Sequence, residues 1–166
     1  MTSTRMALEE TAAADLMTRD VLSVHPAMGV RELADFLTEN EISGVPVIDA
    51  QGKLVGVVSA TDIAQKGGGE GNYALDQSDP RFFVRSFDDT LDVEEMRNLH
   101  IENDELIVRD IMTPTVFTVS AETRAADIAR EMVSGRIHRV FVTNLEGRVV
   151  GIVSALDLLK LLAEGA

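Results

Sequence analysis

The sequence predicts an α/β protein of the α+β type, in which two β-α-β-β-α repeats pack as a pseudo-twofold pair. The first observation is a repeat: residues 54–62, LVGVVSATD, return as VVGIVSALD at 149–157. The second is that each copy alternates strand-like and helix-like segments. The third is size, because a copy of roughly 50 residues is marginal as a free-standing core. We therefore expect the two copies to fold together.

The two copies align without a gap at a constant offset of 95 residues. A repeat of this kind is sought first because it decides the architecture, and two copies favour a pair over a solenoid. The matched positions include Met17 and Met112, Thr18 and Thr113, Gly56 and Gly151, Ser59 and Ser154, and Asp62 and Asp157.

The first copy has the following expected elements. Residues 21–24 are β-branched and predict a strand, and apolar residues at helical spacing predict a helix over 28–40. Residues 45–48 and 54–58 predict a hairpin, with Gly52 at positive φ in its turn. Pro46 cannot donate a ladder hydrogen bond, so we expect it at a strand start or edge. Ser59 or Thr61 is the expected N-cap of the next helix.

The second copy repeats this order, with a strand at 116–119, a helix from about 125, a hairpin of 140–142 and 149–153, and a closing helix over 154–163. The chain is expected to divide into a flexible N-terminus (1–10), repeat 1 (11–66), a glycine-rich and then partly helical linker (67–109) and repeat 2 (110–166). Linker residues 82–87 hold three phenylalanines that we expect to pack on the repeats or on another subunit.

The composition of the chain disfavours several classes of function. The formal net charge is −13, which disfavours nucleic acid because phosphate neutralisation drives that binding. The chain has no cysteine, so disulfides and thiolate metal sites are excluded. No apolar run reaches the length of about 20 residues of a membrane helix, and no signal peptide is evident. We expect a cytoplasmic protein without a membrane partner.

The repeated Gly-x-x-Ser-x-x-Asp motif suggests a ligand site. A hydroxyl at a helix N-terminus lies beside backbone N–H groups that stabilise anions, and a carboxylate one turn later can accept hydrogen bonds from a vicinal diol. Phosphate near Ser59 and a ribose near Asp62 is a reasonable division. The alternative is that Ser59 and Ser154 only cap helices, and that Asp62 and Asp157 complement the helix dipole.

The repeat, the Asp-Leu-Met-Thr and Asp-Ile-Met-Thr openings and the paired Gly-x-x-Ser-x-x-Asp motifs resemble the cystathionine-β-synthase (CBS) domain. Two such units in tandem look like a Bateman module, as in stand-alone bacterial CBS-pair proteins. The resemblance covers residues from about 15 to 162, with the linker as an insert. It implies a homodimer and a regulatory role read by an effector protein that the sequence does not name.

The segment Ile137-His138-Arg139 resembles one in the γ subunit of AMP-activated protein kinase, where such residues meet the nucleotide phosphate. The resemblance implies that the His-Arg of one repeat serves the motif of the other. The implied pocket for an adenine nucleotide (AMP, ADP or ATP) comprises Ser59, Thr61, Asp62, Phe117, His138 and Arg139. Alone, His138 and Arg139 would be interpreted as a solvated strand start.

The mirror pocket would comprise Leu22, Ser43, Gly44, Ser154 and Asp157. Leu156 replaces the hydroxyl of Thr61, and Ser43-Gly44 replaces the His-Arg pair, so a phosphate has no cation there. This weaker pocket suits an uncharged adenosine-type ligand, such as the nucleoside end of S-adenosylmethionine.

No set of residues indicates catalysis. Cysteine is absent, three histidines leave few triad candidates, and no metal-ligand spacing occurs, so we expect no catalytic residues, no metal and no required cofactor. The acidic residues and His100 between 88 and 105 are interpreted as a solvated face. The expected function is a ligand-sensing regulatory module. Its alternatives are a ligand-free dimerisation scaffold and a sensor of an S-adenosylmethionine-type ligand.

Overall fold

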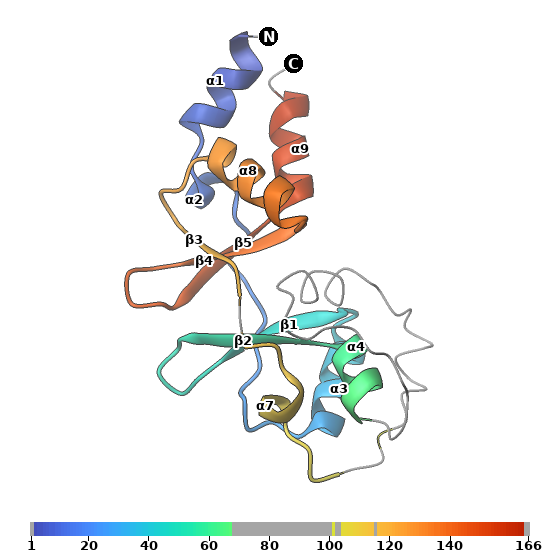
Figure 1. Ribbon diagram of the computed structural model, residues 1–166. Coiled ribbons are helices and arrows are strands. Elements are labelled where there is room, and N and C mark those ends of the chain that lie inside the picture. Colours follow the sequence, from blue (N-terminus) through green and yellow to red (C-terminus); the bar gives the residue numbers. More distant parts are fainter. Residues whose placement is uncertain (1, 68–100, 102–103, 115, 165–166) are drawn as a thin grey trace. The chain divides into compact units, whose positions relative to one another are not determined.

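The computed structural model describes residues 2–67, 101, 104–114 and 116–164 (Figure 1). The expected linker helix, the linker phenylalanines at 82–87 and most of the acidic linker residues lie outside these ranges. The chain forms two compact units, Met1–Val21 with Phe117–Ala166, and Leu22–Val116. Helices and strands occur in both units, so the predicted mixed α+β fold is confirmed.

The unit of residues 22–116 is built on a hairpin. Strands β1 (Gly44–Ile48) and β2 (Leu54–Ser59) pair antiparallel. Gly52, in their turn, has φ 81°, as predicted. Among the described residues of this unit, the helices are α3 (Val30–Glu39), α4 (Ala60–Asp62), the π-helix η1 (Ile63–Gly67) and α7 (Val108–Ile111).

Single bridges extend this hairpin on both sides. Val24 pairs in parallel with Val47, and Thr113 pairs antiparallel with Val57. The predicted strand at 21–24 is therefore wrong in extent, because Val24 alone makes ladder bonds with β1. Its N–H donates to the Pro46 carbonyl at 3.0 Å, and its carbonyl accepts from the Ile48 N–H at 2.9 Å.

Pro46 stands in the middle of β1 and not at its start. It lies opposite Val57, whose N–H and carbonyl both bond to Thr113 and therefore point away from β1. In an antiparallel pair the opposite residue also turns its backbone groups outward. The missing Pro46 N–H thus faces the side of β1 on which the pairing is the bridge at Val24, so no bond of the β1–β2 ladder is lost.

Apolar residues at the predicted helical spacing build the core of this unit. Val30, Leu33 and Leu37 of α3 are buried against both strands of the hairpin, as the pattern over 28–40 predicts. Ile63, Val108 and Ile111 close the same core. The helix ends at Asn40, which donates its backbone N–H to the Phe36 carbonyl.

The unit of residues 1–21 and 117–166 has a three-stranded sheet. Strand β3 (Thr118–Ser120) runs parallel to β4 (Arg139–Thr143), which pairs antiparallel with β5 (Val149–Ser154). Thr18 bridges to Ile152 on β5. The helices are α1 (Thr2–Glu10), α2 (Ala13–Leu16), α8 (Ala125–Gly135) and α9 (Ala155–Glu164).

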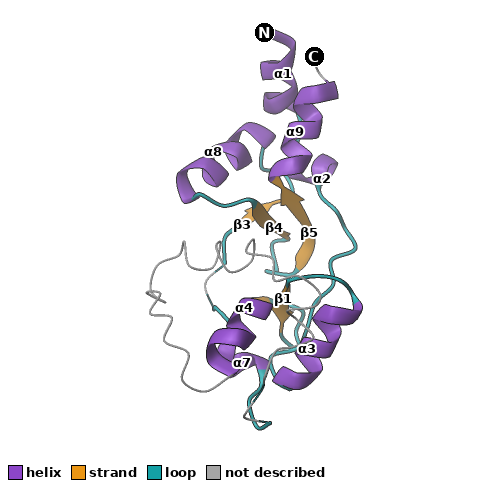
Figure 2. Ribbon diagram, turned by 90° about the vertical axis from the view of Figure 1, so that its right-hand side faces the viewer, coloured by secondary structure: helices purple, strands orange, loops and turns teal. Residues whose placement is uncertain are grey.

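Residues 2–10 form a regular helix, whereas their polar sequence predicted a flexible N-terminus. Helix α1 lies beside α9, as both views show (Figure 2). Ala7 and Leu8 are half-buried, while Arg5 pairs with Glu9 at 3.1 Å on the exposed face. Packing against α9 therefore stabilises a helix that the polar sequence alone does not favour.

Among the described residues, no helix combines the length and the apolar character that crossing a bilayer requires.

Gly56 and Gly151 explain two of the repeated motifs. A Cβ on Gly56 would lie 2.7 Å from the Thr113 carbonyl oxygen, and a Cβ on Gly151 would lie 2.5 Å from Met17 Sδ. The Met-Thr segments therefore run close against β2 and β5 because these strands have no side chain at that point. The aspartate of each opening accepts a hydrogen bond at a helix start: Asp15 from the Ala12 N–H and Asp110 from the Ile107 N–H, both at 3.0 Å.

We predict that Gly56→Ala lowers the free energy of unfolding by about 1–3 kcal/mol, because the new methyl group meets backbone rather than a flexible side chain. Urea unfolding measures this loss. Gly135→Ala is the control, because its Cβ would meet nothing closer than 3.6 Å and alanine favours helix. Equal stability of Gly56→Ala and the wild type would contradict the close approach.

Candidate functional site

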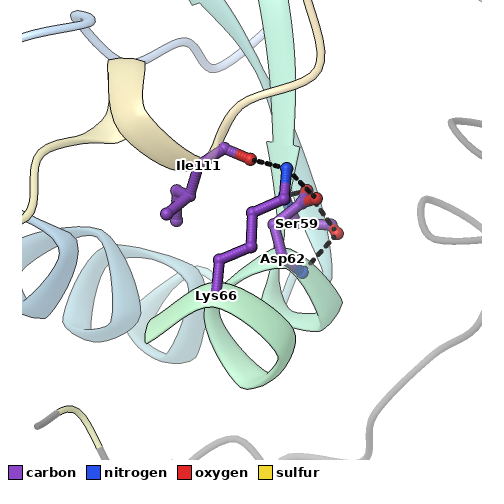
Figure 3. Close-up of polar contacts among 4 residues, drawn as sticks. All are labelled: Ser59, Asp62, Lys66 and Ile111. Carbon is purple, nitrogen blue, oxygen red and sulfur yellow. Dashed lines mark hydrogen bonds and ion pairs between the residues drawn. The ribbon is translucent and has the colours of Figure 1, made fainter. Parts of the chain in front are cut away.

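Ser59 and Asp62 form a reciprocal cap at the start of α4 (Figure 3). The Ser59 backbone N–H and hydroxyl donate to Asp62 Oδ2 at 2.8 and 2.9 Å, and the Asp62 N–H donates to Ser59 Oγ at 3.3 Å. Ser59, and not Thr61, is thus the N-cap. The spacing of three residues is that of a capping box, so the motif has a structural role in this protein.

Asp62 has one carboxylate oxygen left over. Its side chain is 3% exposed, and no donor among the described residues makes a hydrogen bond to Oδ1. Burial raises the pKa of Asp62, while Lys66 and the hydrogen bonds from Ser59 act in the opposite direction. A buried acceptor without a donor costs about 1–3 kcal/mol, so a hydroxyl or water placed there would be stabilising.

Lys66 is a site residue that the sequence analysis missed. Its Nζ lies 3.9 Å from Asp62 Oδ1 and donates to the Ile111 carbonyl at 2.8 Å (Figure 3). The signal was available, because an acid and a lysine four residues apart on a helix face each other. Lys66 follows Asp62 by four residues in the sequence.

The second copy has the same cap. The Ser154 N–H and hydroxyl each donate to Asp157 Oδ2 at 2.8 Å, and Lys160 Nζ lies 3.9 Å from Asp157 Oδ1. The surroundings differ, since the side chains of Asp157 and Lys160 are 20% and 64% exposed. The second carboxylate is therefore much better solvated than the first.

The remaining predicted residues of the unit 22–116 lie around the first cap and along the hairpin. Thr61 is half-buried in α4. The Ser43 carbonyl accepts the Ala60 N–H at 2.8 Å, and Gly44 opens β1 opposite Ser59. The Ala60 and Asp62 N–H groups are thus donated within the chain, so they are not open to the phosphate expected near Ser59. Leu22 is exposed, just before the bridge at Val24.

The predicted cationic residues belong to the other unit. The His138 carbonyl accepts the Ala155 N–H at 2.8 Å, just as Ser43 does in the first copy. Both His138 and Arg139 have exposed side chains, and Arg139 stands opposite Ser154 in the β4–β5 register. Phe117 is half-buried, and its carbonyl accepts the Phe141 N–H at 3.4 Å. The predicted first pocket therefore draws on both compact units.

The fold and the paired capped motifs define a class of protein built from two copies of one mixed helix-and-strand domain. The CBS domain model matches residues 13–68 and 108–164, so the chain belongs to the CBS domain family. The predicted family resemblance is confirmed.

Relatives and structures agree with this assignment. The CBS domain-containing protein CBSX1 of Arabidopsis thaliana is 30% identical over 135 residues, covering 81% of this chain and 56% of that protein. The chain thus spans about half the length of this relative. A CBS domain-containing protein of unknown function from Bacillus anthracis superposes with a TM-score of 0.71 at 20% identity, covering 98% of this chain and 99% of the other.

Two further structures carry ligands. CBSX2 of Arabidopsis thaliana, solved in complex with AMP, superposes with a TM-score of 0.63 at 22% identity, covering 92% of this chain and 96% of that chain. The CBS pair of protein MJ0100, solved with 5′-methylthioadenosine and S-adenosyl-L-methionine, gives a TM-score of 0.61 at 22% identity, covering 94% and 98%. At these identities the likeness establishes the fold.

We predict that Asp62 makes stability fall as the pH rises. Its folded-state pKa lies above the unfolded value of about 3.9, so the folded state binds more protons between these two values and loses stability as the pH rises through that window. Urea unfolding of the wild type and Asp62→Asn from pH 4 to 7 measures it, and the variant should gain relative to the wild type as the pH rises.

Asp157→Asn is the matched control, because it makes the same change in the cap of the second copy, where the aspartate side chain is 20% exposed. Parallel stability profiles of the wild type and Asp62→Asn would contradict the role of burial.

Proposed function

We propose that this chain is a regulatory module that binds an adenine nucleotide and signals its presence by a change of conformation. The observation that carries the proposal is the buried Asp62 Oδ1, which has no hydrogen-bond donor among the described residues. A ribose diol supplies hydroxyl donors for such an oxygen. The chemistry of the donor set therefore supports the role assigned to Asp62 by the family resemblance.

The ligands of the relatives support the same class. CBSX2 was solved with AMP, and the MJ0100 pair with two adenosyl compounds. All three ligands contain an adenosine group, so the nucleoside is the part that they have in common. In our proposal Ser59, Thr61 and Asp62 bind the sugar, His138 and Arg139 bind the phosphate, and backbone near Phe117 borders the adenine. Arg139 suits the phosphate because its guanidinium binds oxyanions through two parallel hydrogen bonds.

The weaker pocket is proposed for an uncharged adenosyl ligand. Its residues are Leu22, Ser43, Gly44, Ser154 and Asp157. The exposed Leu156 occupies the position that Thr61 holds in the first copy, so one hydroxyl donor is missing. The whole module acts without catalysis in this proposal, as a cytoplasmic homodimer that reports to an effector protein.

We expect AMP or ATP to raise the melting temperature of the wild type in a thermal-shift assay. A ligand that binds only the folded state, at a concentration 100 times its Kd, adds about 2.7 kcal/mol to the free energy of unfolding. Arg139→Ala and Asp62→Asn should lose this response. Arg148→Ala is the matched control, an exposed arginine on the same hairpin. S-adenosylmethionine is tested in parallel. No shift at millimolar concentration of any of these ligands would overturn the proposal.

A dimerisation scaffold is the second candidate function. Leu156 and Leu159, one turn apart on α9, are each 59% exposed, and burial of such side chains stabilises association. Sedimentation of Leu156→Ser/Leu159→Ser should give a monomer if α9 forms the interface, while Val133→Ser on α8 serves as a control. A scaffold without a ligand would gain heat stability from protein concentration and not from nucleotide. A dimer that persists in the α9 variant contradicts this interface.

A further inference from the structure

Lys66 connects the Asp62 carboxylate, which we propose binds the ligand, with the end of α7 in the same unit. Its ammonium donates to the Ile111 carbonyl at 2.8 Å and lies 3.9 Å from Asp62 Oδ1, and its side chain is 21% exposed. Figure 3 shows the side chain reaching from its helix toward both groups. One partly buried cation is thus shared between residues that are 49 positions apart in the sequence.

The local helix geometry permits this sharing. Lys66 lies in η1, where the backbone is a π-helix, and single π turns are frequent at functional sites. Lys66 follows Asp62 by four positions, a spacing at which side chains on one helix are neighbours. The ammonium therefore faces the carboxylate while it remains within reach of α7.

The Ile111 carbonyl lies where α7 ends, close to the point at which the chain pairs with β2. Ile111 is the last residue of α7, and the last carbonyls of a helix have no partner within the helix. Thr113 follows two residues later and exchanges two backbone hydrogen bonds with Val57, at 3.0 and 2.8 Å. Val57 lies on β2, the strand that ends in Ser59. Lys66 therefore fixes the end of α7 at the point where the chain docks on the strand that carries the motif.

We propose that Lys66 is a positioning residue that transmits the state of the Asp62 carboxylate to α7 and to the docking of Thr113 on β2. A donor at Oδ1 stabilises the ionised carboxylate, the ionised carboxylate attracts the ammonium, and the ammonium holds the Ile111 carbonyl. The ligand-driven part of this coupling rests on the proposed function. The coupling between Asp62, Lys66 and Ile111 is a property of the chain itself.

Amide hydrogen exchange at Thr113 tests the coupling without any ligand. Lys66→Met should speed exchange of the Thr113 amide about tenfold, the effect of losing one hydrogen bond from a charged donor. Asp62→Asn should speed it in the wild-type background and add nothing in the Lys66→Met background, which is the signature of coupled residues. The Leu33 amide, bonded to Gly29 in the same unit, should change less than twofold.

Lys160→Met is the matched control, because this lysine lies equally far from its motif aspartate and should leave Thr113 unchanged. Lys66→Arg should restore protection. Additive effects of Lys66→Met and Asp62→Asn, or equal changes at Thr113 and Leu33, would overturn the coupling, since a loss of global stability moves both amides together.

Saturating AMP tests the ligand-driven step. It should slow Thr113 exchange in the wild type severalfold, while Lys66→Met still binds AMP by calorimetry and shows no slowing. Full slowing in Lys66→Met overturns the inference although the proposed function stands. Absence of AMP binding to the wild type removes the proposed function for this nucleotide, while the ligand-free cycle still decides the coupling.

Discussion

The close approach of backbone to Gly56 on β2, and of Met17 to Gly151 on β5, is the constraint on which both units depend. Each approach lets a Met-Thr segment bridge to the hairpin, Thr113 to Val57 and Thr18 to Ile152. The opening segment of each repeat, which contains its Met-Thr pair, belongs to the compact unit that holds the rest of the other repeat. A repeat excised at its sequence boundaries would therefore lose a bridge and expose a strand edge, which is a liability for any sheet.

The two oxygens of the Asp62 carboxylate have different roles: one forms the helix cap and the other is left for a ligand. Asp62 Oδ2 is saturated by the Ser59 N–H and hydroxyl and holds the strand-to-helix turn in place. Oδ1 takes no part in the cap, and it is this oxygen that has no donor among the described residues. The structural interpretation of the motif and the ligand interpretation are thus compatible, because they concern different atoms of one side chain.

Local signals in the sequence were sufficient for the elements that local chemistry decides. Helices α3 and α8, both hairpins, the positive φ of Gly52 and the Ser59 cap follow from spacing, turn chemistry and capping preference. Tertiary context decided the rest: the strand at 21–24 shrinks to a bridge at Val24, and α1 forms beside α9. The bond from Lys66 to Ile111 joins residues 45 positions apart, which no local pattern announces.

The two copies of the motif are equal in bonding and unequal in surroundings. Each has a capping box and a lysine 3.9 Å from the free carboxylate oxygen, yet Asp62 is 3% exposed and Asp157 is 20% exposed. Electrostatic interactions strengthen as water is excluded, and so does the cost of an acceptor without a donor. The first copy therefore gains more from a hydroxyl donor than the second, although the serine and the aspartate are identical. The difference lies in the surroundings of the motif: the Lys66 side chain beside Asp62 is 21% exposed, whereas the Lys160 side chain beside Asp157 is 64% exposed.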